Sequence, residues 1–163
     1  MNSDFTCHLL LGGNQGNPKS NFEKSIEFIE KKIGIVVSSS SLYQTAAWGK
    51  EDQAPFLNQV LKVSTKLGPE ILLKEILEIE SLVGRVRYEK WGPRIIDIDI
   101  LFYENAIIEE KDLTIPHPYL HQRAFTLIPL EEIAPELMHP VFNKTISELL
   151  TSCEDTLPVS RID

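Results

Sequence analysis

The stretch GRVRYEKWGPRIIDIDIL, residues 84–101, decides the fold and the chemistry that the chain can carry. Its second half runs on to Phe102 and is apolar and β-branched except at Asp97 and Asp99, a pattern that predicts a strand over residues 95–102. Side chains alternate along a strand, so both carboxylates leave by the same face, with Cα atoms about 6.6 Å apart. Two acids in an apolar strand repel one another and resist burial unless a cation lies over them.

A divalent metal ion is the cation that this acidic pair favours. Oxygen ligands without histidine or thiolate suit Mg²⁺ or Mn²⁺ better than Zn²⁺. A Mg²⁺ ion held by one or two carboxylates takes its remaining ligands from water and substrate phosphates. The alternative for Asp97 and Asp99 is an ordinary edge strand whose polar face lies in water.

Arginines upstream of the strand favour the metal site over that alternative. Arg85, Arg87 and Arg94 carry permanent positive charges, and their planar guanidinium groups suit phosphate oxygens. The turn predicted at residues 92–93 presents Arg94 at the entrance of the strand, and Trp91 offers a flat face for stacking. Acids and arginines together indicate a polyphosphate site, although surface salt bridges would also explain the arginines.

The motifs GRVR at residues 84–87 and WGPRIIDID at residues 91–99 resemble the signature of 6-hydroxymethyl-7,8-dihydropterin pyrophosphokinases, enzymes of folate biosynthesis. The resemblance implies ATP as co-substrate, two Mg²⁺ ions on Asp97 and Asp99, and catalytic roles for Arg85, Arg94, Asp97 and Asp99. The ATP-binding residues that it implies are Glu80, Arg85, Arg87, Trp91, Arg94, Ile100, Thr114, His117, Tyr119 and Arg123. The pterin-binding residues that it implies are Thr45, Trp48, Phe56, Asn58, Asp97 and Phe125.

The resemblance extends along nearly the whole chain. Residues 116–118, Pro-His-Pro, and the run Arg-Ala-Phe at residues 123–125 match a family segment whose histidine and arginine approach the nucleotide phosphates. Residues 46–53 match a loop that closes over the substrates in the family. Asp112 departs from the pattern, because some family members have a basic residue near that point. Glu80, one turn before Arg85, resembles a glutamate near the nucleotide, and a structural partnership with Arg85 or Arg87 is the equal alternative.

The order of predicted elements indicates the fold class. Strands are expected at residues 5–11, 35–45, 56–66 and 95–102, with helices ending at Ile33 and Val83, and Ser20 or Asn21 as the first N-cap. A short strand near Ile108 and a short helix at residues 145–150 follow. This is an α+β chain of ferredoxin-like β-α-β-β-α-β order, with helices packed on an antiparallel sheet and extra C-terminal elements.

The glycine-rich segment GGNQGN at residues 12–17 is predicted to be a tight turn from a strand into a helix. It lacks the G-K-[S/T] ending of a Walker A loop and the spacing of G-x-G-x-x-G, so it does not indicate a phosphate loop.

Composition bounds the class of protein. A chain of 163 residues fits one domain, so residues 1–163 are expected to form a single pyrophosphokinase domain. The net charge of −8 and the absence of a basic cluster disfavour nucleic-acid binding. There is no long apolar run, and Met1-Asn2-Ser3-Asp4 has no basic region of a signal peptide, so a cytoplasmic monomer away from membranes is expected.

The sequence therefore predicts a pyrophosphokinase that transfers the diphosphate of ATP to the hydroxymethyl group of 6-hydroxymethyl-7,8-dihydropterin and releases AMP. A Mg²⁺-dependent phosphoryl or nucleotidyl transferase with another acceptor is the alternative among enzymes. A non-catalytic ferredoxin-like ligand-binding module is the alternative outside enzymes, and it predicts basic, aromatic-rich strand faces or a partner domain, neither of which the sequence contains.

Overall fold

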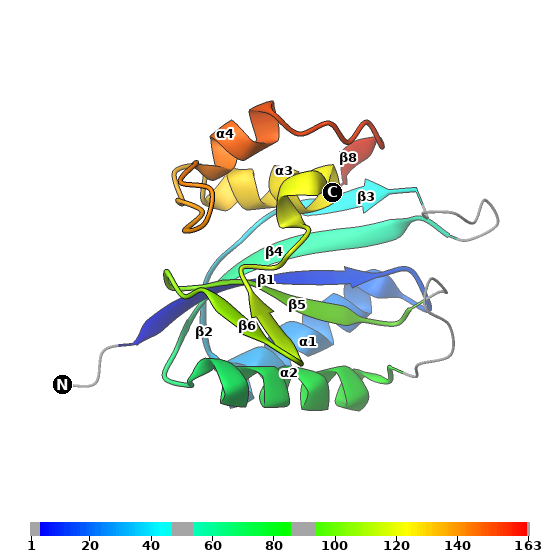
Figure 1. The fold of residues 1–163 in the computed structure, drawn as a ribbon. Coiled ribbons are helices and arrows are strands. Elements are labelled where there is room, and N and C mark those ends of the chain that lie inside the picture. The colour runs from blue at the N-terminus through cyan, green and yellow to red at the C-terminus, as the bar shows by residue number, and fades with distance from the viewer. Residues whose placement is uncertain (1–3, 47–53, 86–93, 163) are drawn as a thin grey trace.

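The chain folds around an antiparallel sheet of six strands in the computed structural model, which describes residues 4–46, 54–85 and 94–162. The main path of the sheet runs β5-β1-β4-β3-β8, and β2 also pairs with β4 (Figure 1). The strands are β1 Phe5–Gly13, β2 Gly34–Ser39, β3 Leu42–Thr45, β4 Phe56–Thr65, β5 Asp97–Tyr103 and β8 Val159–Ile162. A separate hairpin joins β6 Ile108–Glu110 to β7 Leu113–Ile115. The result is an α+β fold with β5 at one edge of the sheet.

Helices α1 Pro18–Lys32 and α2 Pro69–Val83 cover one face of the sheet (Figure 1). Their apolar stripes pack on alternate residues of the strands, because a strand points every second side chain to the same face. The buried residues of this first core include Leu9, Leu11, Leu61, Ile76, Ile79, Ile98 and Ile100. The first core therefore takes Ile98 and Ile100 from β5.

Helices α3 Ala124–Ile133 and α4 Ile146–Thr151 lie over the opposite face, and a short 3₁₀ helix, Leu120–Gln122, leads into α3 (Figure 1). A second core forms there from Leu10, Val60, Leu101, Phe102, Leu127, Leu130 and Leu149. In β5, Leu101 has no partner in the register with β1, which shifts between His8 and Leu9. Such a bulge explains how the consecutive residues Leu101 and Phe102 both reach the second core.

Four details differ from the sequence prediction: a split strand, the first N-cap, helix α3 and strand β8. The strand expected over residues 35–45 is split, because the Ser40 hydroxyl accepts the Val60 N–H at 2.9 Å in place of a backbone carbonyl. Asn17, not Ser20 or Asn21, caps α1, since its side chain accepts the Ser20 N–H and Pro18 begins the helix.

Helix α3 was not predicted, because it is apolar on most of its surface and contains Pro129, which disfavours a helix interior. The strand β8 was also missed. The short helix expected at residues 145–150 is confirmed as α4, which Thr145 and Glu148 open with a capping box. Among the described helices, none has the length and apolarity needed to cross a membrane.

Two isoleucines of α2 test the importance of the first core. Ile76 is fully buried, whereas Ile71 on the same helix is 51% exposed. We expect Ile76→Ala to lower the free energy of unfolding by about 2–5 kcal/mol through lost burial and a residual cavity, and Ile71→Ala to lower it by less than about 1 kcal/mol. Urea denaturation of both variants measures this difference, and equal losses would contradict the assigned packing.

Candidate active site at the start of β5

The two acids of β5 lie on the face of the sheet opposite to α1 and α2. Ile98 and Ile100 point into the first core, so Asp97 and Asp99 leave by the other face, as the alternation along a strand predicts. Both acids are partly buried. Gly12 of β1 is paired with Asp97 on one side and with Asn58 of β4 on the other. The acids therefore begin a polar band that continues across the sheet.

Two arginines hold the Asp97 carboxylate. Arg85 approaches Oδ1 at 2.6 Å, and Arg94 approaches Oδ2 at 2.7 Å. The side chains are 14% exposed for Arg85, 28% for Arg94 and 25% for Asp97, so the ion pairs are shielded from much of the solvent. Because charge-assisted bonds to a guanidinium are short and directional, this arrangement fixes all three side chains together.

The end of α2 delivers Arg85 to this position. The helix stops at Gly84, whose φ of 117° lies in the left-handed region that favours glycine. The Arg85 N–H then donates to the Glu80 carbonyl at 3.0 Å. The chain thereby turns off the helix axis directly before the arginine.

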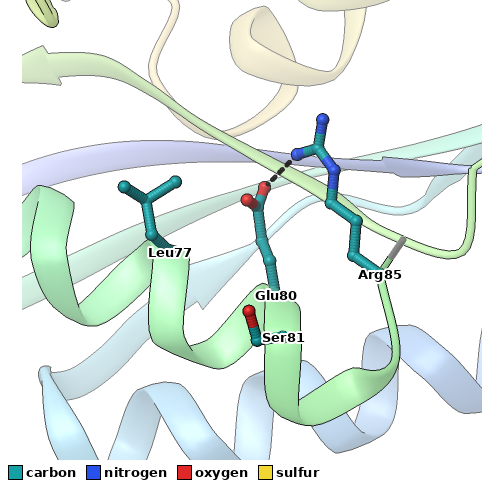
Figure 2. A pocket seen from close by; sticks show the side chains of 4 residues that line it. All are labelled: Leu77, Glu80, Ser81 and Arg85. Atoms are coloured by element: carbon teal, nitrogen blue, oxygen red, sulfur yellow. Dashed lines mark ion pairs between the residues drawn. The ribbon is translucent and has the colours of Figure 1, made fainter. Parts of the chain in front are cut away.

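Glu80 joins α2 to β5 and to Arg85. Its side chain is buried at 3% exposure, accepts the Ile98 N–H at 2.7 Å and pairs with Arg85 at 2.9 Å. Figure 2 shows the Glu80 and Arg85 side chains pointing toward one another. Both residues line an open pocket together with Leu77 and Ser81. Burial raises the pKa of Glu80 to about 7, whereas the Ile98 N–H and Arg85 act in the opposite direction. The structural partnership with Arg85 is therefore confirmed.

Asp99 lies in a different environment from Asp97. Within the described part of the chain its carboxylate makes no hydrogen bond or ion pair. Burial and the charge of Asp97 raise the pKa of Asp99 to about 6, and Arg123, Arg85 and Arg94 oppose this rise. A further positive charge close to Asp99 would therefore stabilise its ionised form.

Residues 117–125 bring a second basic group over the same face. The His117 N–H donates to the Leu101 carbonyl at 3.0 Å, and His117 Nδ1 accepts the Tyr119 N–H at 3.2 Å. Burial and Arg123 lower the pKa of His117 to about 4. The ring is therefore neutral near pH 7 and carries its proton on Nε2. The Arg123 guanidinium carbon lies 5.2 Å from the Tyr119 ring centroid and 5.6 Å from that of Phe125.

The candidate pterin residues on β3 and β4 continue the polar band. Asn58 is buried at 4% exposure and donates to Thr45 Oγ1 at 3.3 Å, while Phe56 is paired with Thr45 in the register. Gly12 separates Asn58 from Asp97, and a Cβ atom at Gly12 would stand 3.1 Å from Asn58 Oδ1. Glycine at position 12 therefore lets the Asn58 amide approach the β1 backbone closely.

The remaining predicted site residues are Ile100 and Thr114, which the structure describes, and three that lie outside the described residues. The Ile100 side chain is in the first core, so only its main chain at the edge of the sheet can face a ligand. Thr114 is exposed on β7, opposite Glu109. Trp48, Arg87 and Trp91 belong to segments that the structure does not describe.

Donor chemistry at the start of β5 fits a hard divalent cation. Asp97 and Asp99 supply carboxylate oxygens from one face, and the described residues contain no cluster of three or more histidine, cysteine or acidic side chains that could hold a metal alone. A Mg²⁺ ion with one or two protein carboxylates and the rest of its ligands from water and phosphates needs no larger cluster.

Comparison with known proteins identifies the family. Residues 8–135 match the family of 7,8-dihydro-6-hydroxymethylpterin-pyrophosphokinase, abbreviated HPPK. The chain belongs to the HPPK family. The resemblance inferred from the signature is thereby confirmed.

Relatives of similar length support this assignment. A protein of Aquifex aeolicus, named 2-amino-4-hydroxy-6-hydroxymethyldihydropteridine pyrophosphokinase, is 46% identical over 143 residues, which cover 88% of this chain and 89% of the relative. A protein of the same name from Methylorubrum extorquens is 41% identical over 149 residues, covering 91% of this chain and 93% of the relative.

A solved structure supports the fold. The wild-type HPPK-DHPS of Plasmodium falciparum, crystallised with STZ-DHP, superposes with a TM-score of 0.77 at 22% identity. The match covers 92% of this chain and 43% of that longer chain. At this identity the likeness supports the α+β fold with its antiparallel sheet.

Sequence reasoning missed one part of the candidate site, the segment that holds the main chain of Arg94. Asn14 lies in the glycine-rich turn, which the sequence predicted to be a turn and no more. Its side-chain Oδ1 accepts the Arg94 N–H at 2.9 Å. The signal was an asparagine directly after two glycines, but its partner is eighty positions away, so no local pattern could identify it.

The buried contacts of Glu80 predict a large effect on stability. We expect Glu80→Ala to lower the free energy of unfolding by about 3 kcal/mol, because the Ile98 N–H and Arg85 both lose a buried partner. Glu80→Gln keeps an acceptor for the Ile98 N–H and is expected to cost about half as much.

Glu78→Ala is the matched control, because Glu78 lies on the same helix and forms an exposed ion pair with Lys32 at 3.3 Å. That variant is expected to cost less than about 1 kcal/mol. Urea denaturation at pH 7.5 measures all three. A loss in Glu80→Ala no larger than in Glu78→Ala would show that Glu80 does not hold α2 against β5.

Proposed function

We propose that this chain is an ATP-dependent pyrophosphokinase that transfers the diphosphate of ATP to the hydroxymethyl group of 6-hydroxymethyl-7,8-dihydropterin. The products are the pterin diphosphate and AMP, and the reaction serves folate biosynthesis. The observation that carries the proposal is the Asp97 carboxylate between Arg85 and Arg94, with Asp99 beside it on the same face. Membership of the HPPK family and the names of relatives up to 46% identical support the group transferred and the acceptor.

Asp97 and Asp99 are the residues that would hold Mg²⁺, and we propose two ions, as expected from the sequence. When bound, Mg²⁺ would neutralise phosphate charge and orient the ATP phosphates. Arg85 and Arg94 could exchange the Asp97 oxygens for phosphate oxygens, which suit their planar guanidinium groups. Exchange of the arginines from Asp97 to ATP would then bring positive charge to the transferred group.

His117, Tyr119 and Arg123 support the assignment of the nucleotide side. His117 is neutral and offers an Nε2–H donor. Arg123 lies over the rings of Tyr119 and Phe125, and its charge lowers the pKa of Asp99. Glu80, Ile100 and Thr114 stay predictions as nucleotide residues, as do Arg87 and Trp91. Because phosphoryl transfers depend chiefly on positioning and electrostatic stabilisation, these basic groups suffice without a strong general base.

Asn58, Thr45 and Phe56 support the assignment of the pterin side. The amide and the hydroxyl of the first two can read the polar edge of a pterin. Gly12 pairs with both Asn58 and Asp97, which would bring a pterin bound there next to the acids. Phe125 lies next to Arg123 at the start of α3, and we propose that it packs on the pterin ring. Trp48 stays a prediction for the same ring.

Three expectations about the topology, the domain and the cellular location also enter the proposal. With β2 and β3 counted as one interrupted strand, the order of β1 to β5 corresponds to the ferredoxin-like β-α-β-β-α-β arrangement. We take residues 1–163 as one pyrophosphokinase domain. A cytoplasmic monomer without nucleic-acid partners stays a prediction.

Product analysis tests the reaction and the acid together. The protein is mixed with ATP, Mg²⁺ and 6-hydroxymethyl-7,8-dihydropterin, and the nucleotides are separated by chromatography. We expect pterin-dependent AMP, and we expect Asp97→Ala to form it at least about 100-fold more slowly, because an electrostatic group of the reaction is lost. Pterin affinity, measured by calorimetry, should change much less.

Glu27→Ala is the control, because Glu27 is an exposed acid on α1 and that helix covers the opposite face of the sheet. Its rate should stay within about twofold of the unmutated protein, since exposed substitutions away from a site have small effects. ADP as the product would favour the alternative transferase with another acceptor. Near-normal AMP formation by Asp97→Ala at saturating Mg²⁺ would remove Asp97 from the mechanism.

A further inference from the structure

We propose that Asn14 is a positioning residue for Arg94, and that it ties the phosphate side of the site to the strand that carries the pterin side. The inference rests on the proposed function, and it concerns the glycine-rich turn after β1, to which the proposed reaction assigns no role. Asn14 is buried at 7% exposure. A buried amide must place its donor and acceptor groups on partners, so its contacts define what it holds.

Both main-chain polar groups of Arg94 are bound by this turn. Asn14 Oδ1 accepts the Arg94 N–H at 2.9 Å, and the Arg94 carbonyl accepts the N–H groups of Asn14 at 2.9 Å and Gln15 at 3.0 Å. Arg94 precedes β5, so it lies outside the ladder of sheet hydrogen bonds. The turn therefore takes the place of a strand partner for this residue.

Close contact of the two backbones supports the same conclusion. A Cβ atom at Gly13 would stand 2.6 Å from the Ile95 carbonyl oxygen and 3.3 Å from that of Arg94. Only glycine permits this approach without displacement of the main chain. The turn and residues 94–95 are therefore packed backbone against backbone, which leaves Arg94 little freedom to shift.

The second arm of Asn14 reaches the strand of the pterin residues. Its Nδ2 donates to the Ala54 carbonyl at 2.9 Å, and Ala54 lies two residues before β4, which carries Phe56 and Asn58. One side chain thus joins Arg94, whose guanidinium contacts Asp97 at 2.7 Å, to the entrance of β4. Loss of Asn14 would alter the placement of the arginine against both the acid and the acceptor side.

Turnover with a matched control tests this role. We expect Asn14→Ala to lower kcat about 10- to 100-fold, with each KM within about threefold, because misplacement of a transition-state group affects rate more than ground-state binding. Asn17→Ala is the control: Asn17 lies in the same turn and caps α1, so its loss lowers stability without touching Arg94. That variant should keep kcat within about twofold well below its unfolding temperature. Equal losses of kcat in both variants would overturn the proposal.

A double-mutant cycle with Arg94→Ala asks whether Asn14 acts through the arginine. If it does, Asn14→Ala should lower kcat by less than about twofold once the Arg94 side chain is absent, because residues that act as one unit are not additive. Multiplicative losses would assign Asn14 an effect of its own and would contradict the proposal.

Hydrogen exchange separates this inference from the proposed reaction. In Asn14→Ala, the amide of Arg94 should exchange at least about tenfold faster, whereas the Ile98 amide, held by Glu80, should not change. Unchanged protection of Arg94 would overturn the inference whatever the activity. If Asn14→Ala does not fold, Asn14→Asp serves, since it keeps the acceptor for the Arg94 N–H but loses the donor to Ala54. It should retain the protection of Arg94 and still lower kcat, and full kcat would contradict the role of the second arm.

Discussion

The Asp97 carboxylate between two arginines is the interaction on which the arrangement of this site depends. Arg85 and Arg94 reach it from different parts of the fold, one from the end of α2 and one from the segment before β5. Each arginine is held in turn by a buried polar residue, Glu80 or Asn14. Both carboxylate oxygens of a partly buried acid at the start of an edge strand are thereby paired, and positive charge is concentrated where we propose that phosphates bind.

The sheet explains why one side of the protein can carry this chemistry. Its first face is filled by α1 and α2, which take the apolar residues of β1, β4 and β5 into a closed core. The second face is covered by α3 and α4. The hydrophobic core that these helices form does not include the polar band from Asp97 to Thr45. Because alternation sends Ile98 inward and Asp97 outward, the same strand contributes to stability on one face and to the site on the other.

Local patterns predicted the elements of this site better than the contacts between them. The acids and arginines follow from a short motif, and the two helices before them, α1 and α2, follow from apolar spacing and glycine stops. The partner of Asn14 lies far away in the sequence, and the serine that splits the predicted strand acts through Val60. Helix α3 was hidden because Pro129 disfavours helix, a preference that the burial of Leu127, Pro129 and Leu130 overrides. Tertiary contacts of this kind leave no periodic signal.

The most direct test of the proposed active site is a crystal structure with Mg²⁺, the pterin and an ATP analogue that has a methylene group between its α- and β-phosphorus atoms. We expect metal ions on Asp97 and Asp99, and we expect Arg85 and Arg94 to contact phosphate oxygens. The β-phosphorus should face the hydroxymethyl oxygen between Asp97 and Asn58. A nucleotide bound elsewhere, with Asp97 still paired to both arginines and without metal, would contradict the proposed active site.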